Sequence, residues 1–280
     1  KSSSIIIGSY ELLKSQLAIL KIKRKIRKIN KTEDIKKNDA VINVLDIPLK
    51  FKKPFNVSRK ESSKYVKKCL LVSHSLCLQK KIKGIINCPI NKKNLFKNKN
   101  QGVTEFLAKK NKVFNSEVMV IYNKNLSVVP ITTHIKLKNV SKFIKKDFLS
   151  KKLITLNKFF IKYLKKTPKI GVLGLNPHNL ELKKNSEEIK VIIPTIKLLK
   201  KSMKVSGPYP SDTVFLKDNL KKFDVIVGMY HDQVLSPFKA LYGFDAVNIT
   251  FGLPYIRMSP DHGIAEDKIK LNVSNPQSLN

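Results

Sequence analysis

Cysteine, glycine, tryptophan and arginine are all scarce in this sequence of 280 residues. The three cysteines, Cys69, Cys77 and Cys88, have no CxxC spacing, which excludes a closed disulfide framework and favours a reducing compartment with the thiols as buried small hydrophobes. Apolar runs all fall short of the roughly 18 to 20 residues that cross a bilayer, and no signal-peptide pattern opens the chain. We therefore expect a cytoplasmic protein with no membrane partner.

The scarcity of arginine argues against nucleic acid as a partner. The formal net charge is +36, yet all but four of the 56 basic residues are lysines, and they are spread through almost every segment. Proteins that read nucleic acid favour arginine, whose planar guanidinium binds phosphate and guanine in a bidentate manner. We expect no nucleic-acid partner, and we interpret the basic run Lys21–Lys28 as a solvated helix face or loop.

Short apolar runs alternate with longer amphipathic stretches, which is typical of strands and helices in βαβ order. Helical spacing of apolar residues predicts helices over Lys60–Lys80 and Phe148–Leu164. The pattern predicts an α/β fold of mostly parallel sheets with flanking helices, in one catalytic unit over residues 1–280 with two interleaved lobes around a central cleft. Seven runs are predicted as strands: Ser4–Ile7, Gly84–Asn87, Val118–Tyr122, Ser127–Ile131, Lys169–Gly174, Asp224–Gly228 and Ala246–Thr250.

Three of the five histidines stand at the same place relative to the predicted strands. His134, His178 and His231 each follow the end of an apolar run, whereas His74 lies inside a predicted helix and is given no role. The carboxyl ends of strands in an open α/β sheet border the ligand crevice, so three imidazoles there can converge on one divalent ion of the zinc, cobalt or iron type. Ordinary polar residues that close strands are the competing interpretation. No GxGxxG or GxxxxGK[ST] element is present, so any dinucleotide must bind in another way.

Eight segments carry a family resemblance, in the family's order and at near-family spacing: Asn87–Lys92, Gly102–Phe106, Thr132–His134, Gly174–His178, Gly207–Thr213, Met229–Gln233, Val247–Arg257 and Asp261–Gly263. In them the chain resembles the 4-hydroxythreonine-4-phosphate dehydrogenase family over nearly its whole length. The resemblance implies a two-lobed fold like that of the isocitrate and isopropylmalate dehydrogenases, and a homodimer with its active site at the subunit interface. It also implies oxidation and decarboxylation of a small phosphorylated amino acid, 4-phosphooxy-L-threonine, with NAD or NADP and a divalent metal, for which zinc, magnesium and cobalt are candidates.

The same resemblance implies roles for individual residues. It makes His134, His178 and His231 the metal ligands, the trio that the strand-end argument also selects. It assigns substrate binding to Thr104, Lys239, Asn248 and Arg257, and cofactor binding to Asp261, His262 and Gly263. Asp212 and Asp232 are the acidic residues nearest these motifs, so we expect them to orient ligands or handle protons, with helix capping by Asp212 as the competing interpretation.

The chain also departs from the family's pattern. Val103 stands where the family has a substrate-binding histidine, Lys270 and Asn272 replace two glycines near the cofactor, and Asn179–Lys183 lacks the usual glycines. The family's opening glycine-rich segment is absent before Ser2, so we expect the natural protein to extend further. Three alternatives stay open: a dehydrogenase for another four-carbon 4-phosphate such as phosphothreonate or phosphoerythronate, a decayed metal-binding relative, and a basic nucleic-acid-binding protein.

Overall fold

A computed structural model describes residues 4–35, 40–91, 95, 102–113, 115–264, 268, 273, 275, 277 and 278. The chain divides into two compact units. Unit 1 comprises Lys1–Ile85 and Asn91–Lys99, and unit 2 comprises Ile86–Ile90 and Asn100–Asn280. The predicted cleft between lobes concerns the arrangement of the two units, and it stays a prediction.

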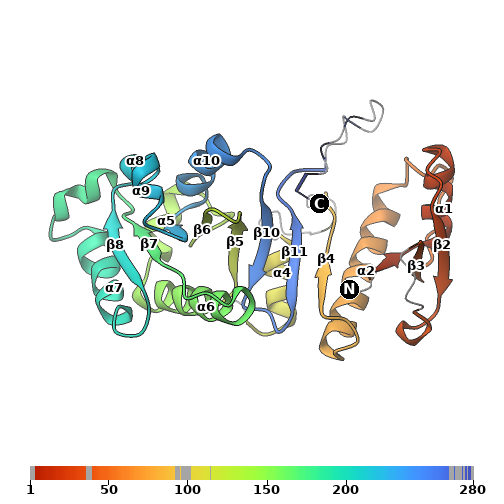
Figure 1. Cartoon of the computed structure of the whole chain (residues 1–280), viewed down its shortest axis with the longest axis horizontal. Coiled ribbons are helices and arrows are strands. Elements are labelled where there is room, and N and C mark those ends of the chain that lie inside the picture. Colours follow the sequence, from red (N-terminus) through yellow and green to blue (C-terminus); the bar gives the residue numbers. More distant parts are fainter. Residues whose placement is uncertain are drawn as a thin grey trace. The chain divides into compact units, whose positions relative to one another are not determined.

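Unit 1 is built on a three-stranded parallel sheet with the order β1-β3-β2. Figure 1 labels strands β2 and β3 of this sheet. Two helices are capped by serines that precede them: Ser9 Oγ accepts a hydrogen bond from Leu12 N at 3.2 Å, and Ser58 Oγ accepts one from Glu61 N at 3.3 Å. The elements of unit 1 are β1 (Ile5–Gly8), α1 (Tyr10–Ile19), β2 (Lys25–Ile29), η1 (Thr32–Asp34), β3 (Val41–Asp46) and α2 (Arg59–Leu78).

Strand β2 corrects the interpretation of the basic run Lys21–Lys28, which is not a helix face or loop over its second half. Its residues pair in parallel with β3, and Ile29 is buried. Because β2 is an edge strand, its lysines can lie along the sheet with their ammonium groups in solvent. Lys28 Nζ also lies 2.8 Å from Asp46 Oδ2 at the end of β3. Residues 25–28 of the run therefore form part of a strand despite their positive charge.

Unit 2 contains most of an eight-stranded sheet with the order β4-β11-β10-β5-β6-β9-β7-β8. The chain passes from unit 1 into unit 2 within β4. The pairs β6/β9, β7/β9 and β7/β8 are parallel, whereas β5/β6, β5/β10 and β10/β11 are antiparallel. The strands are β4 (Gly84–Ile86), β5 (Val118–Tyr122), β6 (Ser127–Pro130), β7 (Ile170–Leu173), β8 (Val205–Tyr209), β9 (Val225–Gly228), β10 (Val247–Phe251) and β11 (Ile256–Pro260).

Both faces of the central strands in unit 2 are buried. Val225 and Val227 of β9 belong to a core cluster with α6 and α7, and Ile226 between them belongs to a second cluster with α10. This double burial explains why these strands read as continuous apolar runs in the sequence. The helical segments are α4 (Val103–Lys110), η2 (Leu137–Asn139), α5 (Val140–Phe143), α6 (Lys146–Leu164), η3 (Pro177–Leu182), η4 (Glu188–Ile192), α7 (Ile193–Leu199), α8 (Ser211–Val214), α9 (Lys217–Leu220) and α10 (His231–Tyr242).

The α/β class with flanking helices is confirmed, and all seven predicted strands occur within one or two residues of their predicted bounds. Helices α2 and α6 confirm the two helical predictions. The antiparallel segment of β5, β10 and β11 was not indicated by the alternation of elements. Cys77 is buried as predicted and Cys69 is partly buried, but the prediction was wrong for Cys88, which is exposed. Among the described residues, no helix has both the length and the apolar character needed to cross a bilayer.

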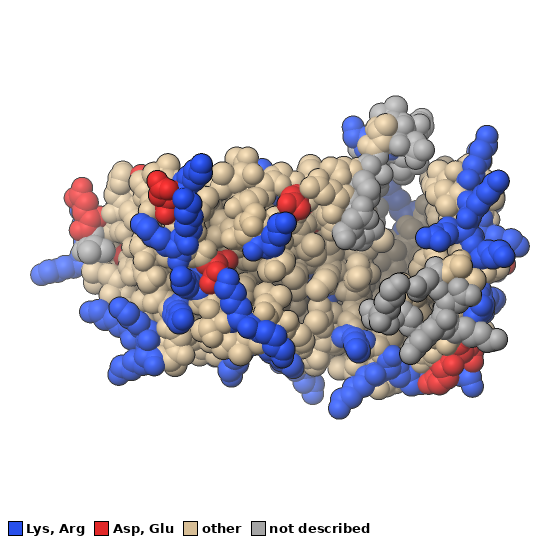
Figure 2. All heavy atoms as spheres, viewed as in Figure 1, with Lys and Arg blue, Asp and Glu red and all other residues tan. Residues whose placement is uncertain are grey.

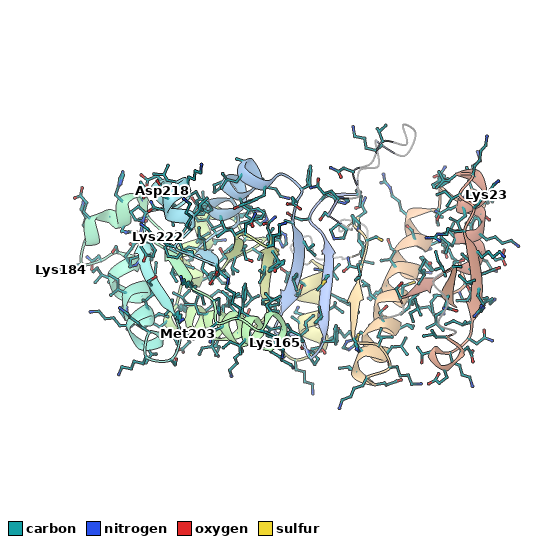
Figure 3. The ribbon with its side chains drawn as sticks, in the orientation of Figure 1. Lys23, Lys165, Lys184, Met203, Asp218 and Lys222 are labelled. Carbon is teal, nitrogen blue, oxygen red and sulfur yellow. The ribbon has the colours of Figure 1, made fainter. Side chains whose placement is uncertain are left out.

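Lysine side chains scatter over the face drawn in Figure 2, with few acidic residues between them. Lys23 in unit 1 and Lys165 and Lys184 in unit 2 are exposed (Figure 3). The charge on this face is diffuse, as the sequence indicated, and does not follow one element.

Candidate functional site

The three predicted histidines lie beyond the ends of three neighbouring parallel strands. His134 follows β6, His178 lies in η3 after β7, and His231 is the first residue of α10 after β9. Because β6, β9 and β7 are adjacent and parallel, their carboxyl ends meet at one edge of the sheet. The predicted topological position of the histidines therefore agrees with the fold.

Two of the three imidazoles face one another. The ring centroids of His134 and His231 lie 6.0 Å apart, with an angle of 40° between the ring planes. The side chain of His178 is 75% exposed and is not grouped with them. Within the described ranges, no set of three or more His, Cys, Asp or Glu side chains is placed to hold one ion. The His134–His231 pair is thus present, and a site that includes His178 stays a prediction.

A carboxylate lies near the Nδ1 atom of each of these histidines. Asp232 Oδ1 is 2.7 Å from Nδ1 of His231, and Glu105 Oε1 is 3.4 Å from Nδ1 of His134. His178 has a looser counterpart, Asp212 Oδ2, at 4.0 Å from Nδ1. When Nδ1 donates its proton to a carboxylate, Nε2 of the same ring keeps a lone pair that can bind a metal ion.

Asp212 and Asp232, which were predicted to orient ligands or handle protons, lie near His178 and His231 respectively, and their roles stay a prediction. The competing interpretation of Asp212 as a helix cap was wrong, because the N-cap residue of α8 is Pro210 and no side chain caps the helix. Both carboxylates are largely exposed, so neither is held as firmly as a buried acid.

Glu105 is the functional candidate that sequence reasoning missed. Its carboxylate accepts hydrogen bonds from Gly102 N at 2.9 Å and from Thr133 Oγ1 at 3.2 Å, in addition to its contact with His134. Burial alone would raise the pKa of Glu105, but the contact with His134 and the hydrogen bonds from backbone N–H groups outweigh burial and bring the pKa down to about 2. The available signal was the position of a glutamate in the first turn of α4, three residues after the N-cap glycine.

A polar face of β10 and β11 holds two predicted substrate residues, Asn248 and Arg257, together with Thr250, which contacts Arg257. Thr250 lies opposite Arg257 in the antiparallel register, and Asn248 projects on the same face because side chains alternate along a strand. Thr104 Oγ1 of α4 lies 3.2 Å from Thr250 Oγ1. Oδ1 of Asn248 is buried and has no hydrogen-bond partner among the described residues.

Arg257 is the buried cation of this face, with 4% of its surface exposed. Its Nε donates to Asn87 Oδ1 at 2.7 Å, and its Nη1 donates to Thr250 Oγ1 at 3.3 Å and to Thr104 Oγ1 at 3.5 Å. Burial lowers the pKa of Arg257 to about 10, against the opposing effect of the Glu105 carboxylate. The partners Asn87 and Thr250 lie inside the quoted motifs but were not singled out from the sequence.

Lys239 is paired with Asp261. Lys239 Nζ donates to the backbone oxygen of Asp261 at 2.9 Å, contacts its carboxylate, and lies 4.7 Å from the ring centroid of Phe244. Burial raises the pKa of Asp261, and the Lys239 ammonium opposes that shift. The predicted substrate cation and a predicted cofactor residue therefore neutralise one another.

The remaining cofactor candidates lie next to this pair. His262 is partly exposed, and its Nδ1 is 2.8 Å from the backbone oxygen of Gly263. Its ring meets the ring of Phe244 edge-on at a centroid distance of 6.3 Å. Lys270 and Asn272 lie outside the described residues.

Two departures from the family pattern have visible structural consequences. Val103, the first residue of α4, is 4% exposed, so an apolar side chain is packed where the family has a histidine. The segment after Asn176-Pro177 has four consecutive residues in the left-handed region, with φ of 49° at His178, 57° at Asn179, 46° at Leu180 and 49° at Glu181. Such a backbone suits glycine, and here it is formed by residues that carry a Cβ.

Comparison with known proteins places these features in a family. The model of the family "Pyridoxal phosphate biosynthetic protein PdxA" matches residues 1–280. The 4-hydroxythreonine-4-phosphate dehydrogenase of Aquifex aeolicus (strain VF5) is 38% identical over 276 residues, which cover 95% of this chain and 83% of the relative. The D-threonate 4-phosphate dehydrogenase of Pectobacterium atrosepticum is 32% identical, with 99% of this chain and 87% of the relative covered.

Solved structures agree with the sequence comparison. A putative 4-hydroxythreonine-4-phosphate dehydrogenase from Salmonella typhimurium superposes with a TM-score of 0.83 at 30% identity, covering 98% of this chain and 86% of that one. A terephthalate 1,2-cis-dihydrodiol dehydrogenase from Burkholderia xenovorans LB400 has a TM-score of 0.66 at 18% identity, with coverage of 98% and 86%, and shows a common fold alone. The chain described here belongs to the PdxA family of pyridoxal phosphate biosynthetic proteins.

Proposed function

We propose that this chain oxidises 4-phosphooxy-L-threonine at its C3 hydroxyl, with NAD or NADP as the hydride acceptor, in the biosynthesis of pyridoxal 5'-phosphate. In this reaction a bound nicotinamide would accept the C3 hydride, and a base in the site would take the hydroxyl proton. The resulting β-keto acid loses its carboxyl group as carbon dioxide, and a proton takes its place to give 3-amino-2-oxopropyl phosphate. Family membership over the whole chain supports this proposal, as does the name of the Aquifex relative.

The observation that carries the proposal is a set of contacts that leads from a buried cation to the histidine pair. Arg257 contacts Thr104, and the next residue of α4, Glu105, contacts His134. His134 in turn faces His231. An anionic substrate group bound at Arg257 would therefore lie within a few side chains of the two imidazoles.

The polar groups of this face suit a small phosphorylated amino acid. The guanidinium of Arg257 supplies a planar set of donors for phosphate or carboxylate, and Thr104 supplies a neutral hydroxyl. The unpaired Oδ1 of Asn248 can accept a hydrogen bond from a substrate amino or hydroxyl group. We propose that Lys239 exchanges its partner Asp261 for the substrate phosphate on binding.

We propose that His134, His178 and His231 hold a divalent metal, with zinc as the first candidate and magnesium or cobalt as the others. The donor chemistry fits, because a carboxylate lies near each Nδ1 and leaves each Nε2 available. A metal held at these nitrogens would lower the pKa of a hydroxyl group bound to it and would stabilise negative charge on oxygen. Asp232 and Asp212 would orient their histidines and exchange protons with solvent.

The cofactor and the oligomer are further parts of the proposal. We assign Asp261, His262 and Gly263 to the cofactor side of the site, which the family resemblance implies. A bound nicotinamide supplies the hydride acceptor, and the chain's part is to orient it against C3 of the substrate and to exclude water. We propose a homodimer in which the second copy completes the active site, and light scattering of the purified chain tests that state.

The test of the proposed function is the formation of NADH or NADPH from 4-phosphooxy-L-threonine, followed by absorbance with and without a metal chelator. We expect turnover that the chelator abolishes and that added zinc or cobalt restores. His231→Gln should abolish turnover, whereas His74→Gln on α2 of unit 1 is the control, with the same substitution at a histidine that is assigned no role. Turnover that persists in His231→Gln would contradict the assignment of the histidines.

The substrate and the alternatives are separated in the same assay. The name of the Pectobacterium relative makes 4-phospho-D-threonate the competing substrate. We expect a higher kcat/KM for 4-phosphooxy-L-threonine, and the opposite order would reassign the substrate. Bound metal without hydride transfer to either cofactor would indicate a relative that has lost turnover.

A further inference from the structure

One buried side chain, that of Gln233, connects two of the strand ends that precede the histidines. Its Oε1 accepts a hydrogen bond from Met229 N at 2.7 Å, and its Nε2 donates one to Gly174 O at 2.7 Å. Met229 follows β9 and Gly174 follows β7. The side chain of Gln233 is only 7% exposed, so both bonds are shielded from water.

The third strand end is connected through the same residue, Met229. Met229 O accepts hydrogen bonds from Thr132 Oγ1 at 2.6 Å and from Thr132 N at 3.2 Å. Thr132 follows β6 and is 4% exposed. A continuous path of hydrogen bonds thus runs from Thr132 through Met229 and Gln233 to Gly174, across the ends of β6, β9 and β7.

These bonds begin where regular strand pairing stops. The register of β7 with β9 ends at Val172 and Val227, and that of β6 with β9 ends at Pro130 and Gly228. Beyond these positions, the two hydrogen bonds of the Gln233 side chain join β9 to β7 in place of backbone hydrogen bonds. The connection is therefore made by a side chain that can be replaced without removing a backbone group.

Neighbouring atoms fix the Gln233 amide in place. A Cβ added at Gly228 would lie 2.9 Å from Gln233 Oε1 and 2.6 Å from a methyl carbon of Val234, so the amide packs closely on backbone. On the far side of Gly174, the buried carboxylate of Glu188 accepts hydrogen bonds from Leu175 N at 2.8 Å and Asn176 N at 2.9 Å. The segment that leads to His178 is thus held from two directions.

We propose that Gln233 is a positioning residue that sets the spacing between the segments carrying His231 and His178, and that Thr132 ties the His134 segment to the same point. The inference rests on the proposed function to the extent that these histidines bind one ion. The loosening that we expect does not depend on a metal: removing the Gln233 amide releases the segment after β7, about 60 residues earlier in the sequence.

Gln233→Met tests the proposal, because methionine keeps the length of the side chain and removes both hydrogen bonds. Gln16→Met is the matched control, since the Gln16 amide donates to Pro54 O at 3.0 Å within unit 1 and takes no part in the path from Thr132 to Gly174. Two properties are measured: the Kd for Co²⁺ by visible absorption, and amide hydrogen exchange of the metal-free protein at Leu175, Asn176 and Asn179. We expect Gln233→Met to weaken Co²⁺ binding by about 10-fold or more and to speed exchange at these amides.

The control should leave both properties as in the native chain. Unchanged Co²⁺ binding together with unchanged exchange after β7 would overturn the proposal, whatever happens at Met229 itself. If the native chain binds no Co²⁺, the metal part of the proposed function fails, and the exchange data alone decide the role of Gln233.

Thr132→Val provides a second variant in case Gln233→Met does not fold. Valine has the shape of threonine and removes only the hydroxyl that donates to Met229 O. We expect a smaller loss of Co²⁺ affinity in this variant and faster exchange of the Met229 amide. Native values for both would overturn the coupling of the three strand ends.

Discussion

Glycine at position 181 should give a more stable protein than alanine at the same position. Glu181 is exposed, and its φ of 49° lies in the left-handed region. A residue with a Cβ pays about 1–2 kcal/mol for this conformation, whereas glycine is about 0.5–1 kcal/mol less favourable than alanine in chain entropy. We therefore expect the free energy of unfolding of Glu181→Gly to exceed that of Glu181→Ala by about 0.5–1 kcal/mol.

Urea unfolding followed by circular dichroism measures this difference between two variants of equal charge. Lys183 is the control position, because it is exposed in the same loop with an ordinary φ of −55°. There we expect the opposite order, with Lys183→Ala more stable than Lys183→Gly by about 0.5–1 kcal/mol. The same order at both positions would refute the left-handed geometry of Glu181.

Three further predictions concern a buried charge, a departure from the family and pH. Arg257→Met should raise the free energy of unfolding by about 1 kcal/mol, because the gain from removing a buried cation exceeds the loss of its hydrogen bonds. The same variant should abolish substrate binding. Urea unfolding checks the first result, and steady-state kinetics checks the second. Val103→His should lower KM for the phosphorylated substrate but cost about 1–3 kcal/mol in stability, because the site is packed around a smaller side chain; a stable variant with unchanged KM would contradict this. Burial alone would raise the pKa of Asp46, but hydrogen bonds from Lys28 and Tyr10 N hold this pKa below its ordinary value of 3.8. The native chain should therefore have its full stability advantage over Asp46→Asn at neutral pH, and should lose it as the pH falls through 3.8 to the lower folded-state pKa. Urea unfolding at a series of pH values checks this.

The strands that could be predicted are those whose environment leaves a mark on composition. β9 is buried on both faces, so its four residues are all apolar or glycine and the run is visible in the sequence. β2 and β11 carry Lys, Arg, Ser or Pro, and their pairing comes from backbone hydrogen bonds that leave little mark in residue type. Apolar patterning therefore detected strands such as β9, and it missed β2 and β11 and also the apolar strand β3 (Val41–Asp46).

The site divides in a similar way. His134 and His231 could be placed at strand ends from local pattern, because parallel strands bring their carboxyl ends to one edge. The contact of Glu105 with His134 could not, since it joins α4 to the loop after β6 across residues far apart in the chain. The pairing of Lys239 with Asp261 also arises only on folding, and it neutralises a cation that was predicted to bind substrate.

Sequence alone determined the α/β class, the identity of the chemically suited residues and the family to which they point, because these depend on residue type and on order along the chain. Tertiary structure decided which of those residues meet: His134 with His231, Arg257 with Thr104 and Thr250, and Gln233 with the ends of two strands. The physical reason is that a hydrogen bond depends on distances of about 3 Å between atoms, and such distances are fixed only when the sheet has set its strand order and register.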